Sequence, residues 1–263
     1  MQSSSRVVPG RFLRVFSHSF LYFSLILLIF SFFSLILRAI SYPFHIFFVS
    51  FGSILRADRD ASRAVAVDFE GVRLGRFGRV CLMQLQDGFG RVLLCDVLRP
   101  HVLAAFAPLL ESHSVLKVIH DCREDSAALY GQHEMRLENV FDTQVAHQCL
   151  ERSKGRPPYQ ASASELLGAP PGPDLKSQML LEPQLWAQRP LKAPLVAYAL
   201  HSVHGLLELR ERQLLEAKGD EELLKEMTAA SQRAVDYREL NSEFPSPDSM
   251  VGAPRISIDF WAS

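Results

Sequence analysis

The chain has 263 residues, a formal net charge of −1 and 48% hydrophobic residues, which leaves room for one mid-sized domain with additional segments. The near-neutral charge excludes a strongly basic nucleic-acid-binding protein and predicts only a modest, salt-dependent affinity for nucleic acid. The four cysteines show no metal-ligand spacing, which predicts buried free thiols in a reducing compartment.

The first 57 residues are apolar and basic, with no Asp or Glu before Asp58. Residues 20–37 form an uncharged run between Arg14 and Arg38. Spanning a bilayer takes about 20 apolar residues, so residues 16–37 are predicted to anchor the protein in a membrane. The folded domain would then face the cytosol or an organelle matrix. A gene start assigned too far upstream is the alternative, and it predicts a cytoplasmic or nuclear protein.

From residue 64 onward, apolar runs separated by turn-forming residues predict alternating strands and helices. The first three strands are expected to pair antiparallel. Predicted strands cover 65–71, 79–85, 91–97, 116–120 and a short run ending near 142. Predicted helices cover 102–112, 123–130, a segment after 142, 163–167, 195–215 and 220–240. The expected units are a folded domain at 62–216, a C-terminal helix at 217–241 and a disordered tail at 242–263, with a loop over the site at 153–183.

Two acidic residues, Asp68 and Glu70, end the first predicted strand. Residues two apart on a strand share one face, so the two carboxylates emerge side by side. Like charges at this spacing repel unless a cation lies between them, and carboxylate oxygens suit Mg²⁺ or Mn²⁺. On these two residues alone, a strand ending in solvated acids is favoured over a metal site.

Further motifs follow in a fixed order. Glu70-Gly71-Val72 leads into Gly75-Arg76 and Gly78, and later segments read His120-Asp121-Cys122-Arg123 and Asn139-Val140-Phe141-Asp142-Thr143-Gln144. Over about residues 64–215, this order resembles the DEDD superfamily of 3′–5′ exonucleases, which includes ribonuclease D. The closest likeness is to its exonuclease 3′–5′ domain-containing branch, with egalitarian-like and piRNA-pathway members. The resemblance implies an α/β, ribonuclease H-like fold, in which a mixed sheet has antiparallel strands first and helices on both faces.

The resemblance also implies roles for individual residues. Asp68 would bridge two divalent ions, Mg²⁺ or Mn²⁺, while Glu70 would help hold the first ion and position a water. Asp125 would support the second ion, and Tyr198 would orient the attacking water. The implied substrate is single-stranded RNA or DNA with a free 3′ end.

One position departs from the family pattern. The fourth carboxylate is expected one helical turn after Tyr198, and the chain has Ser202 there. Serine is a neutral, weak ligand for Mg²⁺, so the first ion loses one negative charge. His201 and His204 are nearby, but His201 is rotated about 100° from Ser202 on a helix, and exposed positions are favoured for both.

Three functions follow as alternatives. The first is a metal-dependent exonuclease with a reduced carboxylate set, and the second is an RNA-binding adaptor of the piRNA or mRNA-transport type that has lost catalysis. A membrane-tethered scaffold unrelated to nucleic acid ranks third. Arg76, Arg123 and Arg189, with Arg73 and Arg79, are candidates for contacts with the nucleic-acid backbone.

Overall fold

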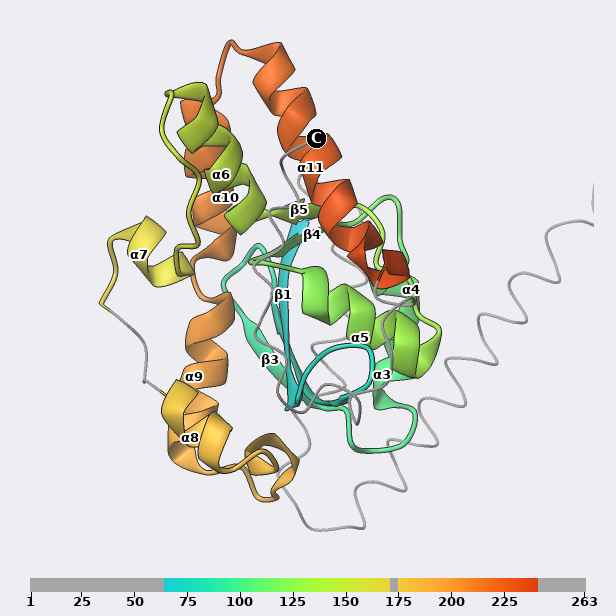
Figure 1. The fold of residues 1–263 in the computed structure, drawn as a ribbon. Helices are drawn as coiled ribbons and strands as arrows, with labels where there is room; N and C mark the ends of the chain where they lie inside the picture. Colours follow the sequence, from blue (N-terminus) through green and yellow to red (C-terminus); the bar gives the residue numbers. More distant parts are fainter. Residues whose placement is uncertain (1–63, 171–174, 241–263) are drawn as a thin grey trace, which may run out of the picture. The chain divides into compact units, whose positions relative to one another are not determined.

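The computed structural model describes residues 64–170 and 175–240, which form strands and helices around one sheet (Figure 1). The sheet has five strands in the order β3-β2-β1-β4-β5. Neighbouring strands pair antiparallel from β3 to β1 and parallel from β1 to β5. The strands are β1 (Ala64–Val72), β2 (Arg79–Gln86), β3 (Val92–Asp96), β4 (Leu116–Ile119) and β5 (Val140–Asp142). The predicted mixed sheet with antiparallel strands first is therefore confirmed.

The central position of β1 and β2 explains their sequences. Seven consecutive residues of β2 are buried after the exposed Arg79, because helices cover both faces of the sheet at this strand. The turn between β2 and β3 is closed by Asp87, whose Oδ1 accepts hydrogen bonds from the backbone N–H groups of Phe89 and Arg91. The predicted hairpin is therefore confirmed.

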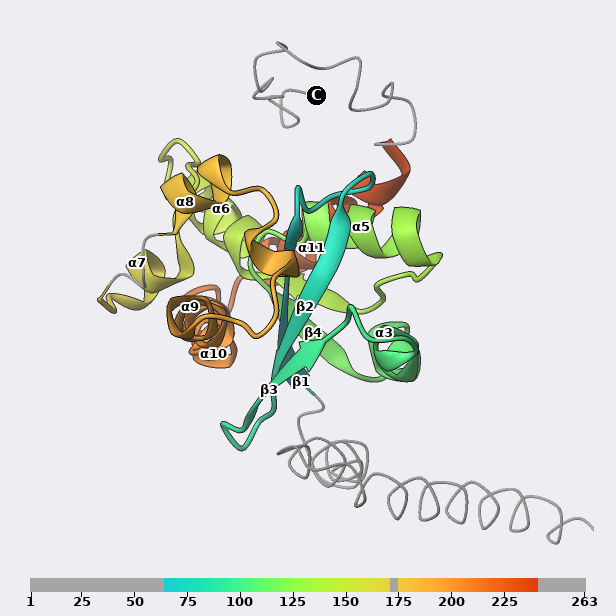
Figure 2. The same ribbon diagram turned by 90° about the horizontal axis from the view of Figure 1, so that it is seen from below.

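Helices lie on both faces of the sheet, as predicted. Figures 1 and 2 show α5 and α3 on one side, and α8, α9 and α10 on the other. The helices are α3 (Val102–Ala105), α4 (Ala107–Leu110), α5 (Arg123–His133), α6 (Thr143–Ser153), α7 (Ala163–Leu167), α8 (Lys176–Leu181), the 3₁₀ helix η1 (Leu185–Ala187), α9 (Ala193–Val203), α10 (Leu206–Glu216) and α11 (Glu221–Leu240).

The predicted continuous helix over 195–215 is wrong, because the chain forms two helices separated at Gly205. This glycine has a φ of +83°, a left-handed conformation that L side chains rarely adopt. A Cβ at this position would also lie 2.7 Å from a methyl group of Leu167. The break gives α9 its own direction over β1, β2 and β3, while α10 packs against α6 and α7.

The C-terminal helix α11 belongs to the folded unit and is not an isolated appendage. It packs against α5, α6 and β5. The Ser126 hydroxyl of α5 donates to the backbone carbonyl of Val235 at 2.7 Å, and the backbone N–H of Asp142 donates to Ser231 Oγ at 3.0 Å. Both bonds are buried, so they fix α11 against the elements that carry Asp125 and Asp142.

The membrane assignment requires correction. Within 64–170 and 175–240, no helix combines the length and the apolar character needed to cross a membrane. This finding contradicts the predicted membrane protein and its membrane-anchored localisation, and neither is retained. The segment at 16–37, on which the prediction relied, lies outside the described residues, as does the predicted tail at 242–263.

Candidate active site

Asp68 and Glu70 lie near the carboxyl end of β1, two residues apart and therefore on one face of the sheet. In the antiparallel pairing with β2, Asp68 lies opposite Gln84 and Glu70 lies opposite Leu82. The register shifts immediately after Glu70, at the step to Gly71. Such bulges re-aim side chains and end regular pairing. Both carboxylates are partly buried, and they lie just before this bulge, after which β1 stays paired with β2 as far as Val72.

Asp68, Glu70 and Asp125 form a cluster of mutually interacting acids. Burial raises the pKa of Asp68 to about 6, although hydrogen bonds from Ser202 and the Phe69 backbone oppose this rise. Burial and the charge of Asp68 raise the pKa of Glu70 well above its usual value. Asp125, almost fully buried in the first turn of α5, has its pKa raised by burial and by the charges of Asp68 and Glu70.

This donor set fits a divalent cation. Burial raises the pKa values of all three carboxylates, and neighbouring acids raise those of Glu70 and Asp125 further, so the cluster gains stability from a positive charge between its members. Among the described residues, no group of three His, Cys, Asp or Glu side chains is placed to hold a metal ion by itself. Mg²⁺ commonly binds through one or two carboxylates, with waters and substrate phosphate as its other ligands. The cluster therefore suits an ion that is completed by substrate.

Tyr198 and Ser202 lie one turn apart on α9, the helix that packs over β1 and β2. Tyr198 is partly buried and its ring centroid lies 5.9 Å from that of Trp186. The Ser202 hydroxyl donates to the backbone carbonyl of Ala199 at 3.0 Å, and it lies close enough to Asp68 to lower the pKa of that carboxyl. A hydroxyl has one proton, so it donates to one of these acceptors at a time.

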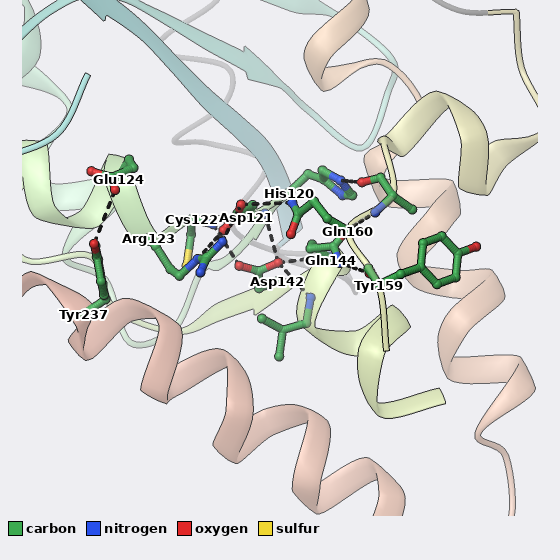
Figure 3. A network of polar contacts seen from close by, with 12 residues as sticks. His120, Asp121, Cys122, Arg123, Glu124, Asp142, Gln144, Tyr159, Gln160 and Tyr237 are labelled. Carbon is green, nitrogen blue, oxygen red and sulfur yellow. Dashed lines mark hydrogen bonds and ion pairs between the residues drawn. The ribbon is translucent and has the colours of Figure 1, made fainter. Parts of the chain in front are cut away.

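Asp142 connects the amino ends of α5 and α6 (Figure 3). It is fully buried, and it caps α6 by accepting from the backbone N–H groups of Gln144 and Val145. The same carboxylate accepts from the N–H groups of Asp121 at 3.0 Å and Cys122 at 2.8 Å. A helix after residue 142 was predicted from the sequence, but the sequence carried no signal for the bonds from Asp142 across to α5. These bonds fix the turn that leads to Asp125.

The segment 159–161 is tied to the same network (Figure 3). Gln144 donates to the carbonyl of Tyr159 at 2.8 Å and accepts from the N–H of Ala161 at 3.0 Å. His120 Nε2 donates to the carbonyl of Ala161 at 2.9 Å, and Gln160 donates to Asp121 at 3.0 Å. The charge of His120 lowers the pKa of Asp68, so His120 connects this segment with the surroundings of that carboxylate.

The candidate arginines lie in three different environments. Arg76 lies over the rings of Phe77 and Tyr130, each 5.8 Å from the guanidinium carbon. The Arg123 guanidinium donates to both carboxylate oxygens of Asp121, at 2.6 and 2.9 Å.

Arg189 is held by contacts on several sides. Its guanidinium donates to the carbonyls of Trp186 and Gln188, to the carbonyl of Cys81 and to the Asp96 carboxylate. These bonds connect the chain before α9 to β2 and β3. The four cysteines, including Cys81, are free and buried, as predicted.

Comparison with known proteins identifies the family of this domain. Residues 52–216 match the 3′-5′ exonuclease domain family. The piRNA biogenesis protein EXD1 of Danio rerio is 34% identical over 152 residues, which cover 52% of this chain and 40% of that protein. Ribonuclease D of Haemophilus influenzae is 30% identical over 155 residues, covering 56% and 35%. The chain therefore spans less than half the length of these curated relatives.

The solved structures show the same fold. The catalytic core of RRP6 from Trypanosoma brucei superimposes with a TM-score of 0.57 at 23% identity, covering 70% of this chain and 48% of that one. Together with the order of the strands, this likeness confirms the ribonuclease H-like fold. Since the matched domain extends over more than half of its residues, the chain belongs to the 3′-5′ exonuclease family of the DEDD superfamily.

Proposed function

We propose that this protein is a metal-dependent 3′–5′ exonuclease that removes nucleotides from the free 3′ end of single-stranded RNA or DNA. The observation that carries the proposal is the electrostatic coupling of Asp68, Glu70 and Asp125: the charge of Asp68 raises the pKa of Glu70, and both charges raise the pKa of Asp125. Clusters of acids with raised pKa values are typical of functional sites. Membership of the exonuclease family supports assigning this cluster to phosphodiester hydrolysis.

Asp68, Glu70 and Asp125 would hold Mg²⁺ or Mn²⁺ through their carboxylate oxygens. When bound, two such ions supply electrostatic stabilisation of the attacking and leaving oxygens in an in-line displacement. The Tyr198 hydroxyl orients the attacking water, and the contact with Trp186 limits the freedom of its ring. Ser202 contributes a neutral hydroxyl where an acid is expected, so the first ion is bound less tightly and Mn²⁺ is favoured.

A second candidate function is an RNA-binding adaptor with impaired catalysis. The observation that favours it is the place of the Ser202 hydroxyl beside Asp68, because a neutral donor there stabilises the Asp68 carboxylate without an ion. A relative named for piRNA biogenesis supports this alternative. Retention of Asp68, Glu70 and Asp125 argues for the enzyme, since an adaptor has no need of three acids with pKa values raised above their usual range.

An exonuclease assay on 3′-labelled single-stranded RNA and DNA, with Mg²⁺ or Mn²⁺, distinguishes the two functions. The wild-type protein is compared with Asp68→Ala and Asp125→Ala, and Glu124→Ala is the matched control because this exposed acid directly precedes Asp125. Metal-dependent trimming that both site variants lose and the control keeps would support the exonuclease. RNA binding without trimming in either metal would support the adaptor, and neither binding nor trimming would contradict both.

A further inference from the structure

Gln84 in the middle of β2 is a buried polar side chain without a partner. Its exposed fraction is 0%, and neither its amide nitrogen nor its amide oxygen has a hydrogen-bond partner within the described residues. Leaving a buried polar group unpaired costs about 1–3 kcal/mol, so each such group requires an explanation. Gln144, also buried, uses both ends of its amide to hold the segment 159–161. A buried glutamine in this domain can therefore be satisfied.

The position of Gln84 relates it to the acid cluster. It lies directly opposite Asp68 in the antiparallel pairing of β1 and β2. Directly opposed residues share a face of the sheet, with Cβ atoms about 4.5–5.5 Å apart. Gln84 and Asp68 are thus cross-strand neighbours, and the next pair on this face is Leu82 with Glu70. The unpaired amide therefore lies beside the carboxylates.

The surroundings of Gln84 leave little room for other partners. Leu82, on the same face of β2, belongs to an apolar cluster with Trp186, Leu195 and Ala199. This cluster separates the face from solvent on the side covered by η1 and α9. The polar side chain directly opposite Gln84 in the pairing is that of Asp68, which also lies beside the Ser202 hydroxyl. The Gln84 amide can therefore donate to the Asp68 carboxylate when that carboxylate is turned away from Ser202.

We propose that Gln84 is a positioning residue for Asp68, and that its amide N–H groups hold the Asp68 carboxylate in the orientation that binds a divalent ion. Ligating carboxylates are themselves usually fixed by hydrogen bonds from a second layer of residues. In the ion-bound protein, Asp68 gives up the Ser202 hydroxyl and accepts from Gln84 instead. The inference rests on the proposed function, because it requires that Asp68 binds an ion.

The test measures Mn²⁺ binding to the full chain by calorimetry, without nucleic acid, so that activity is not the readout. Gln84→Met has nearly the volume of glutamine and no hydrogen-bonding amide. It is expected to weaken Mn²⁺ binding tenfold or more, equivalent to about 1.4 kcal/mol. Gln86→Met is the matched control, since Gln86 is buried on the same strand and face but lies opposite Ala66. The control is expected to bind Mn²⁺ as the wild type does.

A second readout separates positioning from packing. If Gln84 is a positioning residue, Gln84→Met keeps or raises the metal-free unfolding midpoint, because replacing an unpaired polar group by an apolar one of the same shape is near neutral or stabilising. The rise of the midpoint on adding Mn²⁺ becomes smaller. Gln84→Leu provides a second apolar variant if Gln84→Met does not fold.

Each outcome decides the inference. Unchanged Mn²⁺ affinity in a folded Gln84 variant would overturn it, and so would an equal loss in Gln86→Met. Asp68→Ala distinguishes a failure of the proposed function from a failure of the role proposed for Gln84. If Asp68→Ala loses binding while Gln84→Met keeps it, the proposed function stands and the role of Gln84 is wrong. If the wild type binds no Mn²⁺, the proposed function fails and the inference fails with it.

Discussion

The Ser202 hydroxyl on α9, which donates to the carbonyl of Ala199, lies beside the Asp68 carboxylate on β1 and lowers its pKa against the larger effect of burial. In the ion-free protein, a serine here is less costly than a fourth acid, because a neutral donor stabilises Asp68 while a carboxylate would repel it. The same choice weakens ion binding, since the hydroxyl brings no negative charge. A serine at position 202 therefore makes the ion-free site more stable than an acid would, and it lowers the affinity of the site for the ion.

Ser202→Asp should strengthen ion binding and raise activity. Two unit charges 4 Å apart near a protein surface interact by about 4 kcal/mol, and a third of this energy corresponds to a tenfold change in affinity. We expect at least tenfold tighter Mn²⁺ binding and measurable trimming in Mg²⁺, assayed on a 3′-labelled single strand. Ser202→Ala is the control and should not gain either property. A Ser202→Asp protein that binds Mn²⁺ no better than wild type would falsify the assignment of this position.

The raised pKa of Asp68 predicts how stability depends on pH without metal. Folding moves this pKa from 3.8 to about 6, so the folded state binds more protons than the unfolded state between these values. The contribution of Asp68 to the free energy of unfolding is therefore full below about pH 4 and is lost as pH rises toward 6. Urea unfolding in EDTA from pH 4 to pH 7 should show this loss. Mn²⁺ should reduce it, and Asp68→Asn should remove the part due to Asp68.

Local patterns predicted much of the fold around these residues. The strand carrying Asp68 and Glu70 follows from an apolar run, and the hairpin after it follows from the turn residues before Arg91. The division of the last helix at Gly205 could not be predicted in this way, because a glycine within an apolar helical pattern is compatible with a continuous helix. The positive φ of Gly205 is seen only in the folded structure, where this glycine packs against Leu167.

The site could be predicted only in part, because it depends on contacts between segments that are far apart in the sequence. The residue type at 202 was visible in the sequence, but its place beside Asp68 depends on how α9 packs over β1. The isolation of Gln84 depends equally on the pairing register and on the helices that cover β2. Asp125 was identified from its place in a family motif, since nothing in a helix start alone distinguishes a ligand from a solvated acid.

Asp142→Ala should destabilise the whole domain. The carboxylate accepts four backbone N–H bonds, from Asp121, Cys122, Gln144 and Val145. Alanine leaves these donors buried and unpaired, which should lower the free energy of unfolding by about 3 kcal/mol or more in a urea titration. Activity should fall as well at temperatures where the variant is folded, because the turn before Asp125 loses its support.

Asp220→Ala is the matched control for Asp142→Ala. Asp220 also precedes a helix, but it is exposed, and its carboxylate accepts one N–H bond, from Leu223 at 2.9 Å. Its removal should cost about 1 kcal/mol and leave trimming unchanged. Equal losses of stability in the two variants would show that Asp142 acts as a simple helix cap and does not connect α5 with α6.

Tyr198→Phe separates the chemical role of the hydroxyl from the packing role of the ring. Phenylalanine keeps the aromatic contact with Trp186, whose ring centroid lies 5.9 Å away, and so the unfolding midpoint should change little. If the hydroxyl orients the attacking water, the turnover rate at saturating substrate should fall about 10²-fold. Mn²⁺ affinity should stay within about twofold of wild type, because the acids are unchanged. Tyr198→Leu should lower both stability and turnover, since it removes the ring as well. A Phe variant that trims at the wild-type rate would assign Tyr198 to the core that joins α9 to β2, and the water would then have to be oriented by Glu70.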